Sequence, residues 1–196
     1  MLKEFLFIQV VSETITEQEL VSLSSVIKRK PVIWDNLHAN DYDLQRVFLG
    51  PYSGRDPRGV IPNVRGVMTN PNCEYSLNVP AIHTLSAWAK FPLDDLERKW
   101  DPLAASRDAV GPFLEELRRP TSLSVHEQME TEATGEREAL TTEDVEMLFH
   151  FFWLPHSHGP RADTVLAEFE FLRDGAHLSL RVEQDVEDLE GESLMQ

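Results

Sequence analysis

The chain has 196 residues, 41% of them hydrophobic, which suffices for one globular domain or for part of a larger one. Its formal net charge of −16 argues against nucleic acid or an anionic membrane as a partner, because phosphate groups would be repelled. A single cysteine, Cys73, excludes an internal disulfide and favours a reducing compartment. No membrane anchor is expected, since no apolar run approaches the roughly 20 residues of a spanning helix. No signal peptide is expected either, because no small-residue cleavage site follows Phe5 to Val11.

The first two predicted elements are a short strand over residues 2–11 and a helix after it. Thr16 is a suitable N-cap for this helix because acidic side chains occupy the turn that follows. Pro31 ends it. The apolar residues predicted to share one face of the helix are Leu20, Leu23, Val26 and Ile27.

Two apolar runs then predict neighbouring parallel strands. The first, Val32–Trp34, leads into polar residues, and so does the second, over 64–69, after a loop rich in glycine and proline over 49–62. Short continuous apolar runs are typical of buried strands in parallel sheets. Because carboxyl ends of parallel strands meet at one edge, where α/β enzymes keep their sites, we expect both runs to deliver polar side chains to the same place.

The rest of the chain is predicted to be helical, apart from two acidic segments. Apolar spacing and start and stop signals predict helices over 81–90, 104–117 and 142–152, and a helix that resumes at 162–172 after Pro155. The acidic segments, without periodicity, are a linker over 119–140 and a tail over 175–196. The predicted regions are therefore 1–118, 119–140, 141–174 and 175–196.

The densest polar cluster is the run over 34–43, directly after the first strand. It combines an indole, amides and carboxylates, which is the mixture that a pocket for a neutral polyhydroxylated ligand requires. Two other interpretations remain: a polar loop that only caps its own helix, and a metal site. The candidate metal ligands lack the glycine and glutamate of a calcium loop and the paired His or Cys of a zinc site. They are Asp35, His38, Asp41 and Asp43.

The remaining histidines and the cysteine favour structural roles. Three histidines flank a proline and a glycine, as in a turn between helices, and no carboxylate lies near them to support a zinc site. His83 is predicted to belong to the core, and no histidine motif supports a nucleophilic Cys73. No cofactor is expected. The three histidines are His150, His156 and His158.

Several stretches resemble the end of the catalytic barrel of O-GlcNAcase-type enzymes, the hyaluronidase-like glycoside hydrolase family 84. In chain order they are Pro31–Asp43, Phe48–Tyr52, Gly66–Glu74 and Ala81–Leu85, and Phe152–Pro160 resembles the entry to the family's helical stalk. The family fold is a (β/α)₈ barrel followed by a stalk. The resemblance therefore implies an α/β fold: an incomplete C-terminal portion of a TIM barrel over 1–118, the linker, and a first stalk-type helical segment over 141–174.

The resemblance implies a β-N-acetylglucosaminidase that removes O-linked N-acetylglucosamine from serine and threonine of cytoplasmic and nuclear proteins. Those modified proteins are the implied partners, and intact members form homodimers through the stalk. Asp41 and Asn70 are matched to positions that bind the distal sugar hydroxyls. Asn36 and Trp34 would shape the pocket for the acetamido group, and Tyr42 would lie at the rim where the peptide passes.

The chain also departs from the family pattern. The family uses substrate-assisted catalysis, in which one aspartate orients the acetamido group and its neighbour is the general acid. That pair belongs on an earlier barrel strand, and the one adjacent pair in this sequence, Asp94 and Asp95, follows a predicted helix instead. We therefore expect the sugar-binding part of a hydrolase without its catalytic carboxylates. The alternative is a non-catalytic sugar- or partner-binding fragment.

Overall fold

The computed structural model describes residues 11–43, 46–119, 140–167, 169–171 and 173. Contacts divide the chain into two units, residues 1–159 and residues 160–196. The predicted strand over 2–11, most of the predicted linker and the predicted acidic tail lie outside the described residues.

Helix α1, Glu17–Ile27, begins as the sequence predicts. The Thr16 hydroxyl accepts a hydrogen bond from the Glu19 backbone N–H at 3.3 Å, and the Glu19 carboxylate accepts one from the Thr16 N–H at 2.8 Å. This reciprocal capping box satisfies two backbone donors at the start of the helix. The predicted apolar face is only partly correct, because Leu20 is buried whereas Val26 is 53% exposed.

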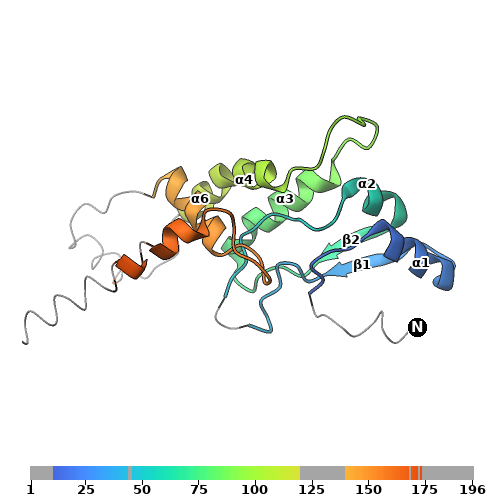
Figure 1. Cartoon of the computed structure of the whole chain (residues 1–196), viewed down its shortest axis with the longest axis horizontal. Coiled ribbons are helices and arrows are strands. Elements are labelled where there is room, and N and C mark those ends of the chain that lie inside the picture. The colour runs from blue at the N-terminus through green and yellow to red at the C-terminus, as the bar shows by residue number, and fades with distance from the viewer. Residues whose placement is uncertain (1–10, 44–45, 120–139, 168, 172, 174–196) are drawn as a thin grey trace, which may run out of the picture. The chain divides into compact units, whose positions relative to one another are not determined.

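The two predicted strands form a two-stranded parallel sheet (Figure 1). Strand β1 spans Val32–Asp35 and strand β2 spans Gly66–Thr69. The loop predicted between them contains a short helix, α2, Pro57–Val60, and a 3-10 turn, Ile61–Asn63. The mixture of helices with a parallel sheet confirms the predicted α/β class.

The prediction that the first strand is buried is wrong for half of its residues. Val32 and Trp34 are 54% and 63% exposed, and Met68, the register partner of Trp34, is exposed as well. Asp35 is buried and Ile33 is half-buried. Among the described residues no third strand or helix covers the outward face of this sheet, so alternate side chains face away from the core.

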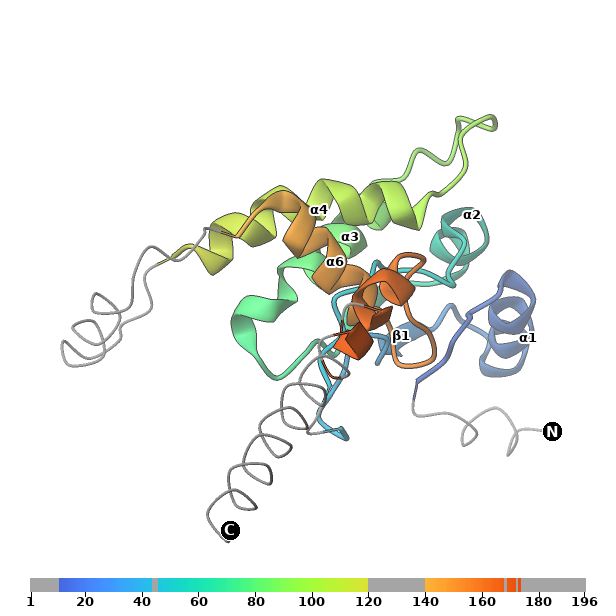
Figure 2. The same cartoon turned by 60° about the vertical axis from the view of Figure 1, so that its left-hand side comes forward.

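Three longer helices follow, close to the predicted positions. A 3-10 turn, Tyr75–Asn78, leads into α3, Val79–Ala89, and α4 spans Pro102–Leu117. Helix α6, Thr142–Phe151, packs against α4, which in turn packs against α3 (Figure 2). The side chains of Asp101 and Thr141 cap the first turns of α4 and α6, which explains where both helices begin.

The apolar core of the first unit has two parts. One lies between α4 and α6, where the rings of Phe113 and Phe149 are 5.4 Å apart. The other lies beside the sheet, where the ring of Tyr52 meets the Trp88 ring edge-on at 5.0 Å. The second core supports the carboxyl ends of the strands, where the predicted site lies.

In the second unit residues 162–167 are helical, which confirms that a helix resumes after Pro155. Within the described ranges the structure contains no helix that is both long and apolar enough to cross a membrane.

Candidate functional site

Asp35, the last residue of β1, is held by a buried arginine and a buried tyrosine. The Arg55 Nε donates to Oδ2 at 2.9 Å and its second terminal nitrogen to Oδ1 at 2.8 Å. The Tyr52 hydroxyl donates to Oδ2 at 2.7 Å, and the Leu37 backbone N–H donates to Oδ1 at 3.1 Å. Bidentate guanidinium–carboxylate pairs are strong and geometrically specific, so this charged cluster fixes the direction in which the chain leaves the sheet.

Arg55 also ties the segment before α1 to the end of the strand. Its side chain is almost completely buried and donates to the carbonyl oxygens of Ser12, Glu13 and Ser53 at 2.7 to 2.9 Å. Burial, and next the charge of Asp35, raise the pKa of Tyr52, so its hydroxyl stays a hydrogen-bond donor. Every strong donor in the cluster therefore has an acceptor, as a buried ion pair requires.

Three of the predicted sugar-binding residues meet at the carboxyl edge of the sheet. The Trp34 indole Nε1 donates to the Asn36 Oδ1 at 2.8 Å, and the Asn70 Nδ2 donates to the same oxygen at 3.3 Å. The Asn70 backbone N–H donates to the Asp35 carbonyl at 2.8 Å, which extends the pairing of the strands by one residue. The structure thus brings together polar groups that lie 34 residues apart in the sequence.

The other two predicted residues, Asp41 and Tyr42, lie on an exposed turn a few residues further on. Within the described ranges no hydrogen bond engages the Asp41 carboxylate, so both of its oxygens are available to a ligand. Partial burial raises the pKa of Tyr42, which keeps its phenol neutral. Both side chains are accessible, as contacts with a sugar and with the peptide that carries it would require.

His38 lies in the same loop but is buried. Its Nε2 donates to the Gly50 carbonyl at 2.8 Å, and its Nδ1 is buried without a hydrogen-bond partner. Burial lowers the pKa of His38 to about 4, so the ring is neutral at physiological pH. Asp35 and His38 therefore have protein partners. Among the described residues no group of three or more His, Cys, Asp or Glu is arranged to bind a metal ion.

His156 and His158 follow Pro155 and Leu154 in the predicted turn, whereas His150 is buried in the last turn of α6, and its Nε2 lies 3.8 Å from the Glu146 carboxylate, so the prediction that no carboxylate lies near these histidines is wrong for His150. The His150 ring stacks on Trp153 at 5.1 Å, and the His158 Nδ1 lies 3.0 Å from the Phe151 carbonyl oxygen. His83, predicted to be a core residue, is only half-buried on α3. The thiol of Cys73 is exposed.

The sequence did not point to Arg55 or Tyr52. Arg55 lies in a loop rich in glycine and proline, where a charged side chain is expected to be exposed. Its buried position depends on Asp35, 20 residues earlier, which no local pattern indicates. An aspartate that ends an apolar strand was the only available signal, because such a group needs a partner once it is buried.

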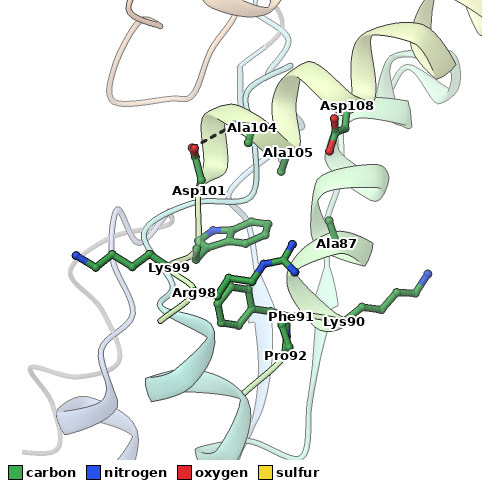
Figure 3. Close-up of a pocket in the computed structure, with 11 residues that line it drawn as sticks. Ala87, Lys90, Phe91, Pro92, Arg98, Lys99, Asp101, Ala104, Ala105 and Asp108 are labelled. Atoms are coloured by element: carbon green, nitrogen blue, oxygen red, sulfur yellow. Dashed lines mark hydrogen bonds between the residues drawn. The ribbon is translucent and has the colours of Figure 1, made fainter. Parts of the chain in front are cut away.

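A hollow of about 360 Å³ lies elsewhere, between α3, the start of α4 and the segment that joins them. Figure 3 shows Phe91 and Arg98 among the side chains that line it, and Asp101, which caps α4. None of the five predicted sugar-binding residues lines this hollow. It is separate from the polar edge of the sheet.

Comparisons with known proteins show which family the chain resembles. A family profile described as beta-N-acetylglucosaminidase matches residues 8–118, more than half of the 196 residues and the segment that contains both strands, α3 and α4. The Protein O-GlcNAcase of Rattus norvegicus and that of Mus musculus are each 51% identical to this chain over 90 residues. That match covers 46% of this chain and spans only 10% of the length of either relative.

Among solved structures, a variant of an O-GlcNAc hydrolase from Thermobaculum terrenum superposes with a TM-score of 0.48 at 25% identity. The match covers 54% of this chain and 22% of the other. On the extent of the profile match and the identity to the two mammalian relatives, the chain belongs to the beta-N-acetylglucosaminidase family of glycoside hydrolases, which includes the O-GlcNAcases.

Proposed function

We propose that this chain is the N-acetylglucosamine-binding part of an O-GlcNAcase-type enzyme and that the carboxylates that cleave the sugar lie outside it. The observation that carries the proposal is the group Trp34, Asn36 and Asn70, joined by hydrogen bonds at the carboxyl edge of a parallel sheet. Open parallel α/β sheets and barrels bind their ligands at that edge.

The chemistry of each residue suits a neutral sugar. The Asp41 carboxylate has acceptor oxygens for two hydroxyl groups, and a charged acceptor binds hydroxyls more strongly than a neutral one. Asn70 contributes an amide that is hydrogen-bonded to Asn36. The Trp34 indole is 63% exposed, so its ring offers a flat apolar wall to the acetamido group while its N–H is retained by Asn36. Tyr42 would contact the peptide at the rim.

The adjacent aspartates of the sequence do not suit the role of the catalytic pair. Asp94 and Asp95 are exposed on the segment between α3 and α4, away from the strand ends. Substrate-assisted hydrolysis needs one carboxylate against the acetamido nitrogen and a general acid at the glycosidic oxygen. We infer that another segment of an intact enzyme supplies both.

The same proposal assigns residues 1–118 to the end of a (β/α)₈ barrel and residues 141–174 to the start of a helical stalk that pairs two protomers. The exposed face of the two-stranded sheet supports it. In a closed barrel the side chains of the other strands fill the interior and would cover a face that looks into it. The partners would be O-GlcNAc-modified proteins of the cytoplasm and nucleus. The single cysteine of the sequence is compatible with those reducing compartments.

Turnover of an aryl N-acetyl-β-glucosaminide tests the catalytic half of the proposal. We expect the purified chain to release no product above the uncatalysed rate, because both orientation of the acetamido group and general acid catalysis are missing. Product release that Asp41→Ala abolishes and Asp108→Ala leaves intact would contradict it. Asp108 is a matched control because its carboxylate is exposed on α4, apart from the strand ends.

A further inference from the structure

Three buried asparagines lie next to the proposed sugar-binding residues without being among them. Asn40, Asn72 and Asn78 are 4%, 3% and 6% exposed. Asn40 directly precedes Asp41, and Asn72 follows Asn70 with one proline between them. A buried side-chain amide is costly unless its donors and acceptor are satisfied, so the partners of these three residues are informative.

Asn40 joins the loop after β1 to the loop after β2. Its Oδ1 accepts a hydrogen bond from the Cys73 backbone N–H at 2.7 Å. Its Nδ2 donates to the Glu74 carboxylate at 2.8 Å and to the Arg46 carbonyl at 3.1 Å. One short side chain thus connects the segment that carries Asp41 to the segment that follows Asn70.

Asn72 and Asn78 continue the connection. The Asn72 side chain pairs with Phe48 as a strand would: its Oδ1 accepts from the Phe48 N–H at 2.8 Å and its Nδ2 donates to the Phe48 carbonyl at 3.0 Å. The Asn78 Oδ1 accepts from the Asn72 backbone N–H at 2.8 Å and from its Nδ2 at 3.2 Å. The Asn78 Nδ2 donates to the Asn72 carbonyl at 2.9 Å and to the Glu74 carbonyl at 3.2 Å.

We propose that Asn40, Asn72 and Asn78, called the amide bridge below, are positioning residues that set the separation between the Asn36–Asp41 loop and Asn70. The inference deepens the proposed function and rests on it for the identity of the ligand. A sugar hydroxyl bound from both loops requires a fixed distance between them, and a displacement of about 1 Å is enough to weaken such a site strongly.

Asparagine is suited to this role for a chemical reason. Each bridge residue must donate and accept on the same short side chain, and the amide does both without carrying charge. An aspartate of the same shape would keep the acceptor and lose the donor. Asn72→Asp would place a carboxylate oxygen against the Phe48 carbonyl and the Asn78 Oδ1, and the resulting repulsion should move the loop after β2.

The experiment uses the ¹⁵N-labelled 196-residue chain and N-acetylglucosamine itself. The reporters are the Trp34 indole N–H and the Asn70 side-chain amide, both of which bond to Asn36. We expect Asn72→Asp to shift both signals and to weaken sugar binding by about fivefold or more, equivalent to roughly 1 kcal/mol. Asn63→Asp is the matched control. Among the described residues the Asn63 amide donates to the Gly59 carbonyl, and both residues precede β2, whereas the loop with Asn72 follows it.

A rescue pair separates positioning from general destabilisation. Asn40→Asp sets a carboxylate against Glu74 and should weaken sugar binding in the same way. Adding Glu74→Gln supplies an amide that can donate to the new carboxylate, and we expect it to restore part of the affinity and part of the Asn70 signal. This pair decides the matter if Asn72→Asp does not fold.

The outcomes are distinguishable. The proposal would be overturned if Asn72→Asp lost the exchange protection of the Phe48 N–H while the Trp34 and Asn70 signals and the sugar affinity stayed unchanged. It would also be overturned if the Asn40→Asp, Glu74→Gln double variant bound the sugar no more tightly than Asn40→Asp alone. A wild-type spectrum without dispersed Cys73 and Phe48 amides would also overturn it, because the bridge would not exist. If the wild type bound no sugar but Asn72→Asp still shifted the Asn70 and Trp34 signals, positioning would stand and the proposed ligand would fail.

Discussion

Two polar clusters hold the ends of the strands, and they do so by different means. The charged cluster consists of Asp35, Arg55 and Tyr52 and depends on one guanidinium that reaches several acceptors. The amide bridge consists of neutral side chains, and three short amides share its contacts. The direction of β1 therefore depends on a single residue, Arg55, whereas three asparagines together set the spacing of the loops beyond it. Substitutions should affect the two clusters unequally for this reason.

The largest effect is expected from Arg55→Met, because it leaves the Asp35 carboxylate buried without its counter-charge. Removing one partner of a buried ion pair costs about 3 to 5 kcal/mol. Hydrogen exchange at the Leu37 N–H, which is bound by Asp35, measures this loss locally. Arg65→Met, at an exposed position, should leave that exchange rate within about twofold of wild type. Equal rates in the two variants would show that the ion pair does not hold the strand end.

Acidification should act through His38, which is buried in the loop between Asp35 of the charged cluster and Asn40 of the amide bridge. Its folded pKa is about 4 against an ordinary 6.5, so the unfolded chain binds a proton first as the pH falls. The contribution of neutral His38 to the free energy of unfolding is therefore complete above pH 6.5, decreases between pH 6.5 and pH 4, and is lost below pH 4. The full change is about 3 kcal/mol.

The His38 prediction is checked by following unfolding or exchange against pH in wild type and in His38→Gln. Between pH 6.5 and pH 4 the free energy of unfolding should fall less steeply with decreasing pH in the variant than in wild type. Parallel pH profiles would mean that another group titrates there and that the buried histidine contributes nothing to acid sensitivity.

A smaller effect is expected in the amide bridge from Asn78→Ala. Truncation leaves the Asn72 N–H without its acceptor in a buried place, which costs about 1 to 3 kcal/mol. Exchange at the Asn72 N–H should accelerate accordingly, while exchange at Leu37 in the charged cluster should be unchanged. If Leu37 accelerates to the same extent, the two clusters form one cooperative unit and the distinction between them is wrong.

The smallest effect is expected outside both clusters, at the start of α6. The Thr141 hydroxyl accepts from the Asp144 N–H at 3.2 Å on an exposed helix end. Thr141→Ala should cost about 1 kcal/mol as the loss of an N-cap. Thr142→Ala, one residue further along, should have little effect, and circular dichroism during thermal unfolding compares the two variants. A larger loss of stability in Thr142→Ala than in Thr141→Ala would show that Thr141 is not the N-cap.

Local signals in the sequence were enough to predict the longer helices, the two parallel strands and the meeting of Asn36 with Asn70, but not the short helix α2. Caps such as Thr16 act over three residues, and strand ends follow from the period of the apolar run. The burial of Arg55 and the exposure of Trp34 could not be predicted in this way. Both depend on what packs against a strand from distant segments, and the continuous apolar run around Trp34 suggested cover that the described residues do not provide.

The central claim is that this chain binds N-acetylglucosamine at the carboxyl edge of its sheet through Asp41. Titration of the sugar into the ¹⁵N-labelled chain, followed at the Trp34 indole N–H, tests it most directly. We predict a saturable shift of that signal, lost in Asp41→Ala and retained in Asp108→Ala, because only the former removes the charged acceptor for the sugar hydroxyls. A Trp34 signal that does not respond to the sugar, or that responds equally in Asp41→Ala, would contradict the assignment of this edge as the sugar-binding site.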